Sequence, residues 1–383
     1  LGKIEVNYED KPFEPLSVFH LPETLNKFIK GIKKENKGKA YVVIDALRNP
    51  YEVKFFKDRY SAFHLVSINA PDENRRDYLN SYKFSGESID EIDDRESGKV
   101  FNQTNIRKDK ISYFTSINIS RCIEVSDIHI YNPKKHDDDS DILKAQLAWY
   151  VSLMLHPGLV SPTSMERVMQ LAYSAKLNSG CISRQVGAVV TDINNSIKSV
   201  GWNDVAKGQI SCALRTVRGV LTNNDNDTYS HYELNNEPFR AQMEIIRVKL
   251  DERQESLKGM TVPYCFKDIK NNLDSKGNQV HTRSLHAEEN AFLQLSKYGS
   301  VGIEGGRLYT TASPCELCAK KAYQLGIKEI IYIDPYPGIA QEHILNIGKE
   351  KPTLIQFRGA IGRTYHRLYE QRSEEHTSEL QSR

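Results

Sequence analysis

Two stretches decide how this chain folds: Ser284-Leu285-His286-Ala287-Glu288 and Ser313-Pro314-Cys315-Glu316-Leu317-Cys318. Together they supply one histidine, two cysteines and a carboxylate, and Cys315 lies 29 residues after His286. Imidazole and thiolate are ligands that zinc prefers, and three protein ligands are typical of catalytic zinc because the fourth tetrahedral position stays open for water. We therefore predict that His286, Cys315 and Cys318 bind a Zn2+ ion.

Helix-capping rules predict the local structure around these residues. Pro314 is suited to the first position of a helix, which would place Cys315 and Cys318 on one face of the opening turn. The free N–H groups and the dipole of that turn favour thiolates, the form of cysteine that binds metal. Glu288 follows His286 by two residues, so on a helix the two side chains point in different directions. We predict that Glu288 transfers protons and does not bind the metal.

The spacing of these residues predicts a reaction. An H-x-E stretch followed by P-C-x-x-C is the signature of zinc deaminases. Zinc lowers the pKa of bound water from about 15.7 toward neutrality, and Glu288 would take the proton and return it to the ring nitrogen and the leaving ammonia. The carbon attacked would be an amidine carbon such as C4 of cytosine. The alternative is a structural zinc with His281 or Cys265 as fourth ligand, although Glu288 has no role in such a closed site.

The residues around the two stretches predict alternating helices and strands in a second region, residues 163–371. The predicted elements are a helix at 165–176, strands at 186–190 and 197–202, a helix from 286, a strand at 306–311, a helix from 314 and a strand at 329–333. An insertion at 204–280 interrupts them and contains a predicted amphipathic helix at 237–257. Such alternation predicts a three-layer α/β/α domain.

The sequence of a first region, residues 1–135, predicts a second α/β domain. Ala40–Asp45 is a short apolar run that is typical of a buried parallel strand. Pro50 would open a helix, and the stretch 63–70 predicts the next strand. This order of strand, helix and strand favours a parallel sheet.

The linker and the two chain ends are set apart from these domains. Residues 136–162 are predicted to form a linker whose helix runs from Ile142 to Leu155. The chain begins at Leu1 without a methionine, so we expect residues upstream. Residues 372–383 resemble the translation of a sequencing adapter and are excluded from the fold prediction.

Composition limits the class of protein. Lys and Arg total 52 against 50 Asp and Glu, and the formal charge of +2 shows no overall basic bias of the kind that binds a phosphate backbone. Six cysteines in 383 residues are too few for a secreted disulfide scaffold. The longest nearly apolar stretch, Leu147–Leu155, is about half of the roughly 20 residues that a membrane helix needs. We predict a cytoplasmic protein without a membrane span.

From about Met165 to Tyr336 the chain resembles the deoxycytidylate deaminase branch of the cytidine deaminase superfamily. The matching stretches are Ser179-Gly180-Cys181-Ile182-Ser183-Arg184-Gln185-Val186-Gly187-Ala188, Gly201-Trp202-Asn203, His286-Ala287-Glu288-Glu289-Asn290-Ala291 and Ser313-Pro314-Cys315-Glu316-Leu317-Cys318-Ala319-Lys320. The resemblance implies the same three zinc ligands and the same acid–base carboxylate. It also implies that Asn203 hydrogen-bonds the sugar or base and that the Ala287 backbone helps to bind the pyrimidine. Tyr332 and Tyr336 would line the nucleotide pocket, with packing at the end of the strand as the alternative.

Three further expectations come from this resemblance. Some members carry a second, structural zinc, and the candidate ligands here are Cys181, Cys212, Cys265 and His281. Buried or merely reduced thiols are the alternative for these cysteines. Asp204 stands where the family often has glycine, a departure that bears on its triphosphate-effector site. Family members commonly assemble, so we expect a homo-oligomer.

The first region resembles a P-loop nucleotide-kinase domain. The resembling stretches are Val43-Ile44-Asp45-Ala46-Leu47-Arg48-Asn49-Pro50-Tyr51-Glu52-Val53 and Val125-Ser126-Asp127-Ile128-His129-Ile130-Tyr131-Asn132. The phosphate loop itself, G-x-x-x-x-G-K-[ST], does not occur, so it lies upstream of Leu1 or the domain is degenerate. Arg75 and Arg76 are candidate lid arginines for the phosphates of a nucleotide bound to this domain, and solvated helix charges are the alternative.

A kinase-like domain followed by such a deaminase is the architecture of bacterial antiphage dCTP/dCMP deaminases. This resemblance implies deamination of dCMP, dCTP or both, with a nucleotide or RNA regulating through the first domain. One alternative is a deaminase that acts on cytosine or adenine in RNA or single-stranded DNA. The near-neutral charge argues against it, unless the insertion 204–280 forms a local groove. The other alternative is a non-enzymatic nucleotide-binding regulator with a structural zinc.

Overall fold

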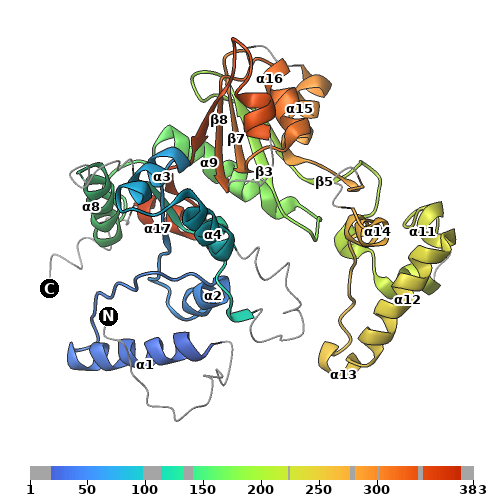
Figure 1. Ribbon diagram of the computed structural model, residues 1–383, viewed down its shortest axis with the longest axis horizontal. Helices are drawn as coiled ribbons and strands as arrows, with labels where there is room; N and C mark the ends of the chain where they lie inside the picture. The colour runs from blue at the N-terminus through green and yellow to red at the C-terminus, as the bar shows by residue number, and fades with distance from the viewer. Residues whose placement is uncertain are drawn as a thin grey trace. The chain divides into compact units, whose positions relative to one another are not determined.

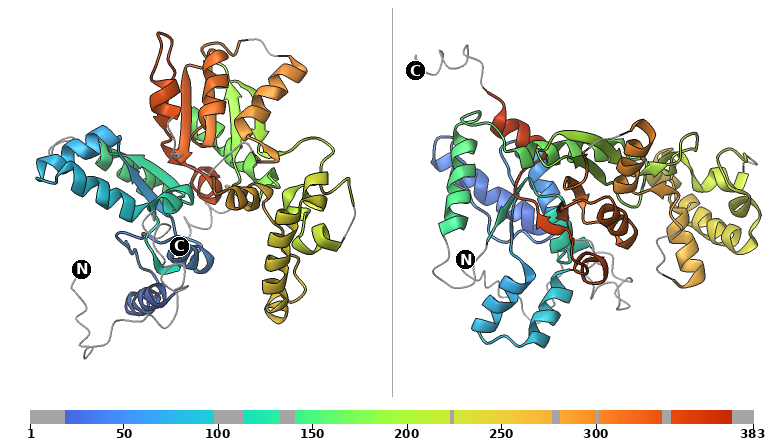
Figure 2. Two further views of the ribbon diagram at one scale, coloured as in Figure 1. Left: turned by 45° about the vertical axis from the view of Figure 1, so that its right-hand side comes forward. Right: turned by 90° about the horizontal axis from the view of Figure 1, so that it is seen from above.

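The computed structural model describes most of the chain (Figures 1 and 2). The described residues are 19–97, 114–132, 141–222, 225–276, 281–299, 302–334 and 340–371. The chain divides into two compact units, Leu1–Ser152 and Leu153–Arg383. The predicted tail at 372–383 and the start of the predicted linker, residues 136–140, lie outside the described residues.

The first unit contains helices and two strands. They are α1 (His20–Glu35), α2 (Pro50–Arg59), β1 (Val66–Asn69), α3 (Asp72–Ser81), α4 (Gly86–Glu96), α7 (Ile119–Glu124), β2 (Ile128–Tyr131) and most of α8 (Asp141–Leu155). Pro50 begins α2 as predicted, and the Asn49 side chain caps that helix by accepting a hydrogen bond from the Tyr51 N–H at 2.8 Å. The strands β1 and β2 pair in parallel, which confirms an α/β unit.

The strand predicted at Ala40–Asp45 is wrong. This segment has no regular structure, and its side chains include Tyr41 and Val43, which are 91% and 94% exposed. A buried strand needs a neighbour that satisfies its backbone N–H and C=O groups. In the described part of the chain, β1 and β2 pair with each other and residues 40–45 have no strand partner.

Arg75 and Arg76 contact carboxylates of α3 and α4. An Asp93 oxygen lies 2.6 Å from Arg75, and an Asp90 oxygen lies 2.7 Å from Arg76. Both arginines also pair with Asp72. These contacts favour the alternative of solvated helix charges over lid arginines.

The second unit is built on a five-stranded sheet with the order β4-β3-β7-β8-β9. Its main elements are α9 (Ser164–Ala175), the short helix Lys176–Asn178, β3 (Gly187–Thr191), β4 (Ile197–Trp202), α15 (Ala287–Tyr298), β7 (Arg307–Ala312), α16 (Glu316–Gln324), β8 (Glu329–Asp334), the π-helix Gln341–Leu345, β9 (Thr353–Gln356), β10 (Gly359–Ala360) and α17 (Gly362–Tyr369). Strand β3 is antiparallel to β4 and β7, whereas β7, β8 and β9 are parallel. The predicted helices and strands of this domain are therefore confirmed.

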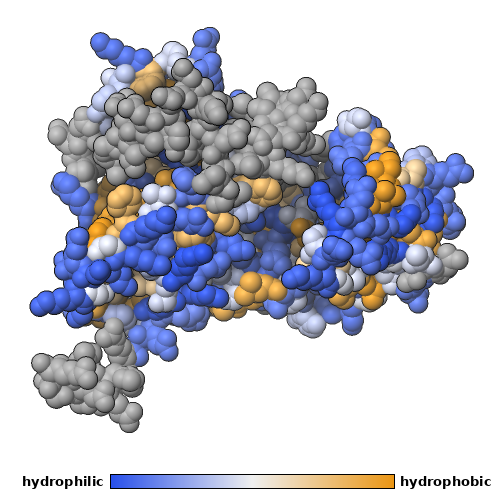
Figure 3. All heavy atoms as spheres, turned by 90° about the horizontal axis from the view of Figure 1, so that it is seen from below, coloured by the Kyte–Doolittle hydropathy of each residue, from blue (hydrophilic) through white to orange (hydrophobic). Residues whose placement is uncertain are grey.

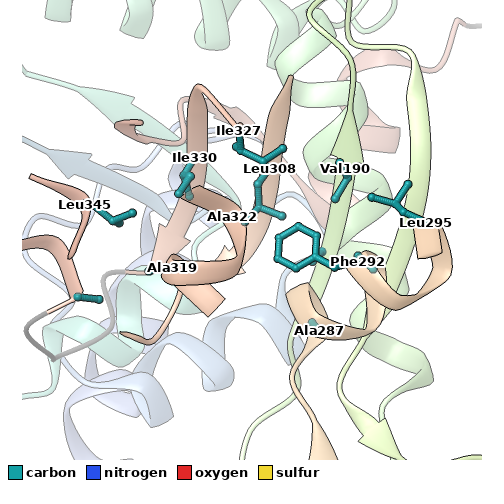
Figure 4. Close-up of a cluster of buried hydrophobic side chains, with 13 residues drawn as sticks. Val190, Ala287, Phe292, Leu295, Leu308, Ala319, Ala322, Ile327, Ile330 and Leu345 are labelled. Atoms are coloured by element: carbon teal, nitrogen blue, oxygen red, sulfur yellow. The ribbon is translucent and has the colours of Figure 1, made fainter. Parts of the chain in front are cut away.

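Each face of this sheet is covered by helices. On one face, buried side chains of the strands and of α15 and α16 form a core around Val190, Ala287, Phe292, Leu295, Leu308, Ala319, Ala322 and Ile330, as Figure 4 shows. On the other face, α9 contributes Val168, Met169 and Ala172, which pack against Val189, Tyr309 and Ile331. Because successive strand residues point to opposite faces, Leu308 and Tyr309 serve the two cores. The result is the predicted α/β/α arrangement.

The insertion forms a helical part of the second unit with its own core. Its elements are β5 (Asp204–Val205), the turn helix Cys212–Leu214, α10 (Val217–Thr222), α11 (His231–Asn235), α12 (Glu237–Asp251), α13 (Gln254–Leu257), α14 (Phe266–Asp274) and β6 (Ser284–Leu285). The helix predicted at 237–257 is two helices, since α12 ends before Arg253. Strands β5 and β6 pair in antiparallel fashion, with Asp204 opposite Leu285, and this pairing closes the insertion.

No helix in the described residues is both long and apolar enough to cross a membrane. On the face that Figure 3 draws, hydrophobic side chains form separate patches among hydrophilic ones.

Gly201 allows α15 to approach β4. A Cβ atom at Gly201 would overlap the Ala287 carbonyl oxygen and the Ala291 backbone. These are backbone atoms inside a helix, so they cannot move aside as a flexible side chain would.

We predict that Gly201→Ala lowers the free energy of unfolding by about 1–3 kcal/mol, the usual cost of overpacking a core. Chemical denaturation of the two proteins measures it. Gly86→Ala is the control, because a Cβ atom at Gly86 has nothing within 4 Å. Equal losses in the two variants would contradict the close approach at Gly201.

Candidate metal centre and substrate cavity

Three side chains meet where two helices begin. His286 is the N-cap residue of α15 and Cys315 is the N-cap residue of α16, both without a side-chain capping hydrogen bond, while Cys318 lies in the first turn of α16. The His286 Nδ1 atom is 3.3 Å from the Cys315 Sγ and 3.5 Å from the Cys318 Sγ. Pro314 precedes the N-cap residue Cys315, and α16 begins at Glu316, so the predicted helix start at Pro314 was wrong by two residues. The predicted convergence of the two cysteines is correct.

The geometry of these three residues suits zinc. Their ligand atoms all lie within 4.8 Å of one another. A nitrogen and a sulfur that share a tetrahedral zinc, with bonds of about 2.0 and 2.3 Å, lie roughly 3.6 Å apart. The observed separations of 3.3 and 3.5 Å are close to that value.

Hydrogen bonding sets the protonation of the two thiols. A hydrogen bond from Cys318, together with His286, lowers the pKa of Cys315 to about 3, so Cys315 is a thiolate. The pKa of Cys318 is raised because its proton is shared with Cys315 and because it is buried. The contact with Cys315 in turn raises the pKa of His286. The site therefore already carries negative charge on sulfur, which attracts a cation.

Glu288 lies beside this group but is separate from it. The side chain is buried, at 4% exposure, and Thr310 on β7 donates a hydrogen bond to its Oε1 at 3.2 Å. Burial raises the pKa of Glu288 above its usual range. The group of potential metal ligands does not include it. Its position is thus the one predicted for a proton-transferring carboxylate.

A cavity of about 250 Å³ opens beside the metal ligands. Its lining is Cys181, Ser183, Arg184, Val186, Asn203, Lys267, Thr282, Ser284, Leu285, His286, Ala287, Glu288, Ala312, Ser313 and Cys315. The lining therefore includes the carboxylate of Glu288 and two of the three metal ligands, His286 and Cys315. It also includes two basic side chains, Arg184 and Lys267. A small polar molecule could therefore meet the metal, an acid–base group and a cation at once.

Asn203 and Ala287 both line this cavity, as the resemblance implied. The Asn203 amide is held by the backbone, because its Oδ1 accepts from the Val186 N–H at 2.7 Å and its Nδ2 donates to the Arg184 carbonyl at 2.6 Å. Each end of an amide has capacity for a second hydrogen bond. Asn203 thus shapes the cavity wall and retains capacity to bind a ligand.

Of the two tyrosines predicted for the pocket, the structure describes only Tyr332. Tyr332 lies on β8, paired with Thr310 and Gln356, and is not among the residues that line the cavity. Tyr336 lies outside the described residues.

The predicted second metal site is not assembled in the described part of the chain. Cys181, Cys212, Cys265 and His281 do not form a group of potential ligands there; Cys181 instead lines the cavity. Burial raises the pKa of Cys265 to about 11, so its thiol is protonated. His281 lies 3.9 Å from an Asp274 oxygen. These thiols fit the alternative of buried or reduced cysteines.

Sequence reasoning missed Lys267 and gave Arg184 no role. Arg184 lies in a matched stretch of the chain, and it pairs with the buried Asp334 at the end of β8. Lys267 lies in the insertion, far from either motif, and no spacing rule connects it with His286. Only the folding of α14 against the site brings it to the cavity.

Comparisons with known proteins agree with this site. The family described as "Cytidine and deoxycytidylate deaminase zinc-binding region" matches residues 162–334. The deoxycytidylate deaminase of Enterobacteria phage T2 is 31% identical over 170 residues, which are 44% of this chain and 79% of the phage protein. The corresponding enzyme of Enterobacteria phage T4 is 32% identical over 170 residues, 44% of this chain and 77% of that protein.

A solved structure of dCMP deaminase from the cyanophage S-TIM5 is also similar. It is 21% identical, and the match covers 51% of this chain and 99% of that chain with a TM-score of 0.28. A TM-score of that size adds nothing to the sequence matches. The sequence matches and the geometry together identify His286, Cys315 and Cys318 as the zinc-binding residues.

We predict that Cys318→Ser abolishes stoichiometric zinc binding, because serine is a poor ligand for zinc and only two ligands remain. Atomic absorption on the purified protein measures the bound metal. The matched control is Cys265→Ser, which removes a thiol outside the metal group and should retain zinc. Loss of zinc in both variants, or in neither, would contradict the assignment.

Proposed function

The chain belongs to the cytidine and deoxycytidylate deaminase family, and we propose that it hydrolyses the 4-amino group of cytosine in dCMP, dCTP or both. The observation that carries the proposal is one cavity in which the buried Glu288 lies beside His286 and Cys315. The reaction consumes one water and releases one ammonia, and it leaves the uracil nucleotide. A structural zinc site would have no use for a carboxylate in an accessible cavity.

The residues of this chain supply the binding and the proton transfers. When bound by His286, Cys315 and Cys318, zinc provides a Lewis acid that makes water nucleophilic near neutral pH. Glu288 takes a proton from the attacking water and delivers it to the ring nitrogen N3. It then moves the proton of the new C4 hydroxyl to the amino group, which leaves as ammonia when the C4–N bond breaks and the C4 carbonyl forms. Thr310, which donates to Glu288 Oε1, holds the carboxylate in one orientation. The Ala287 backbone at the start of α15 lies in the cavity wall, where it would contact the pyrimidine.

We predict that Glu288→Gln lowers kcat for dCMP deamination by roughly 100-fold to 10,000-fold, the usual contribution of a general acid and base. The amide has the same shape but cannot accept the proton from water. Ammonia release with dCMP and dCTP measures the rate, and atomic absorption measures zinc. The variant should retain its metal. Loss of zinc would make Glu288 a ligand, and an unchanged rate would refute its role in proton transfer.

We also propose that the protein depletes deoxycytidine nucleotides during phage infection, with the first unit responding to a nucleotide or RNA. The proposal is supported by the order of the two parts, an α/β unit with parallel strands β1 and β2 followed by a deaminase. Deamination of dCTP would remove a precursor that phage DNA synthesis needs.

The expected outcome in phage-infected bacterial cells is a fall of dCTP and a lower phage yield when the wild-type chain is expressed. Cells that express Glu288→Gln should keep both at the level of cells without the protein. Nucleotide pools measured by mass spectrometry, together with plaque counts, provide the readout. Equal pools in wild-type and variant cells would refute the depletion role.

A further inference from the structure

Helix α1 of the first unit has two sides of opposite chemistry. Its large apolar side chains recur every three or four residues, the spacing that places side chains on one side of a helix. They are Leu21, Leu25, Phe28 and Ile32. The lysines of α1 fall between them in the sequence and therefore lie on the rest of the helix surface. They are Lys27, Lys30, Lys33 and Lys34. The helix is thus basic and amphipathic.

Much of the apolar side of α1 is exposed to water. Leu21 is 53% exposed, Phe28 57% and Ile32 39%, and we call these three residues the α1 stripe. Helix α1 lies beside α2, as Figure 1 shows, and Asn26 accepts a hydrogen bond at 2.6 Å from the hydroxyl of Tyr60, which follows α2. This contact leaves the α1 stripe uncovered. Three large apolar side chains that are exposed together on one helix indicate a surface for binding.

The positive charge of α1 is not balanced by carboxylates in contact with it. In the part of the chain that the structure describes, none of the four lysines of α1 forms an ion pair. From His20 to Lys39 the sequence contains six lysines against two glutamates. This local excess of positive charge beside the α1 stripe is complementary to an anionic surface.

Helix α12 of the second unit provides a comparison within the same chain. It also exposes two aliphatic side chains, Ile245 at 49% and Val248 at 48%. Its basic residue Arg247, however, pairs with Glu244 and with Asp251, each at 2.7 Å. Exposed apolar residues therefore occur on both helices, and the unpaired lysines distinguish α1.

The surroundings of α1 favour a flat partner that is both anionic and apolar. A groove in a partner protein would enclose the whole apolar side of an amphipathic helix, yet Leu25 and Ile29 at the edge of the α1 stripe are already partly buried. A nucleic acid would neutralise the lysines but would leave Leu21 and Ile32 in water. A membrane with anionic lipids satisfies both sides, because its interface takes up the apolar side chains and its headgroups attract the lysines.

We propose that α1 binds to the surface of an anionic lipid membrane. The helix, roughly 24 Å long at 1.5 Å per residue, lies in the plane of the interface with the α1 stripe inserted and its lysines against the lipid headgroups. The attachment is peripheral, since no helix in the described residues is long and apolar enough to cross a membrane. This binding goes beyond the proposed deamination and does not depend on it.

Sedimentation of the full chain with lipid vesicles tests the proposal. The protein should bind vesicles of phosphatidylcholine and phosphatidylserine and should bind phosphatidylcholine alone much more weakly. Phe28→Ser should lower the partition coefficient by about 10-fold to 100-fold, the effect of keeping one large apolar side chain out of an apolar environment. Lys30→Gln should lower it by about 5-fold, the effect of one cation near an anionic surface. The matched control is Ile245→Ser on α12, where the side chain is similarly exposed and binding should not change.

A fluorescence measurement separates insertion into the membrane from adsorption by charge alone. Phe28→Trp places an indole in the α1 stripe, and its emission should move to shorter wavelength with vesicles that contain phosphatidylserine. A single-stranded RNA oligonucleotide should produce no such shift. Absence of vesicle binding, equal binding to the two kinds of vesicle, equal losses in Phe28→Ser and Ile245→Ser, or a shift with RNA and not with vesicles would each overturn the proposal.

Discussion

The convergence of two helix N-termini is the constraint on which this site depends. His286 and Cys315 occupy the N-cap positions of α15 and α16, so the backbone itself places two of the ligands, and Cys318 follows within the first turn of α16. Helix N-termini present free N–H groups and a positive dipole end, which favour thiolates and carboxylates. An ion pair between Glu289 and Lys321 joins the two helices directly beside the ligands. The sheet is the platform that holds both helix starts in place.

Burial of the Glu288 carboxylate costs free energy, and the fold contains contacts that offset this cost. Removing Glu288 from water disfavours its charged form, and the fold offsets this with a hydrogen bond from Thr310 and a place in the first turn of α15. The insertion repeats the pattern on a larger scale, with Arg215 and Glu233 fully buried and Tyr264 bonded to both. Both groups are costly to bury and precisely placed. Glu288 itself lines the cavity, and Glu233 contacts Arg283, which is next to the lining residue Ser284.

The predictions succeeded where a pattern is local and failed where it needed a partner. The second unit carries strong local signals, and the helices and strands around its five-stranded sheet lie close to where periodicity indicated, although the helix predicted at 237–257 is two helices. The prediction failed at one segment of the first unit, because the apolar run at 40–45 has the composition of a strand but no neighbouring strand to pair with in the described part of the chain. Likewise, four residues of metal-binding types in and around the insertion suggested a second zinc, yet the described part of the chain does not assemble them. Residue type indicates what a side chain can do, and only proximity determines whether it does so.

The sequence by itself determined the zinc ligands, the place of Glu288 outside the ligand group and the layered α/β fold of the second unit. It could do so because the spacing of the ligands follows local helix geometry and the side chains of a strand alternate between its two faces with a period of two residues. Only the tertiary structure decided which remote residues share the cavity. Lys267 and Ser183 are 84 residues apart in the chain and meet through the fold of the insertion, whose anchor is the ion pair between Arg215 and Glu233. Such contacts depend on packing between distant segments, and no local pattern of residues encodes them.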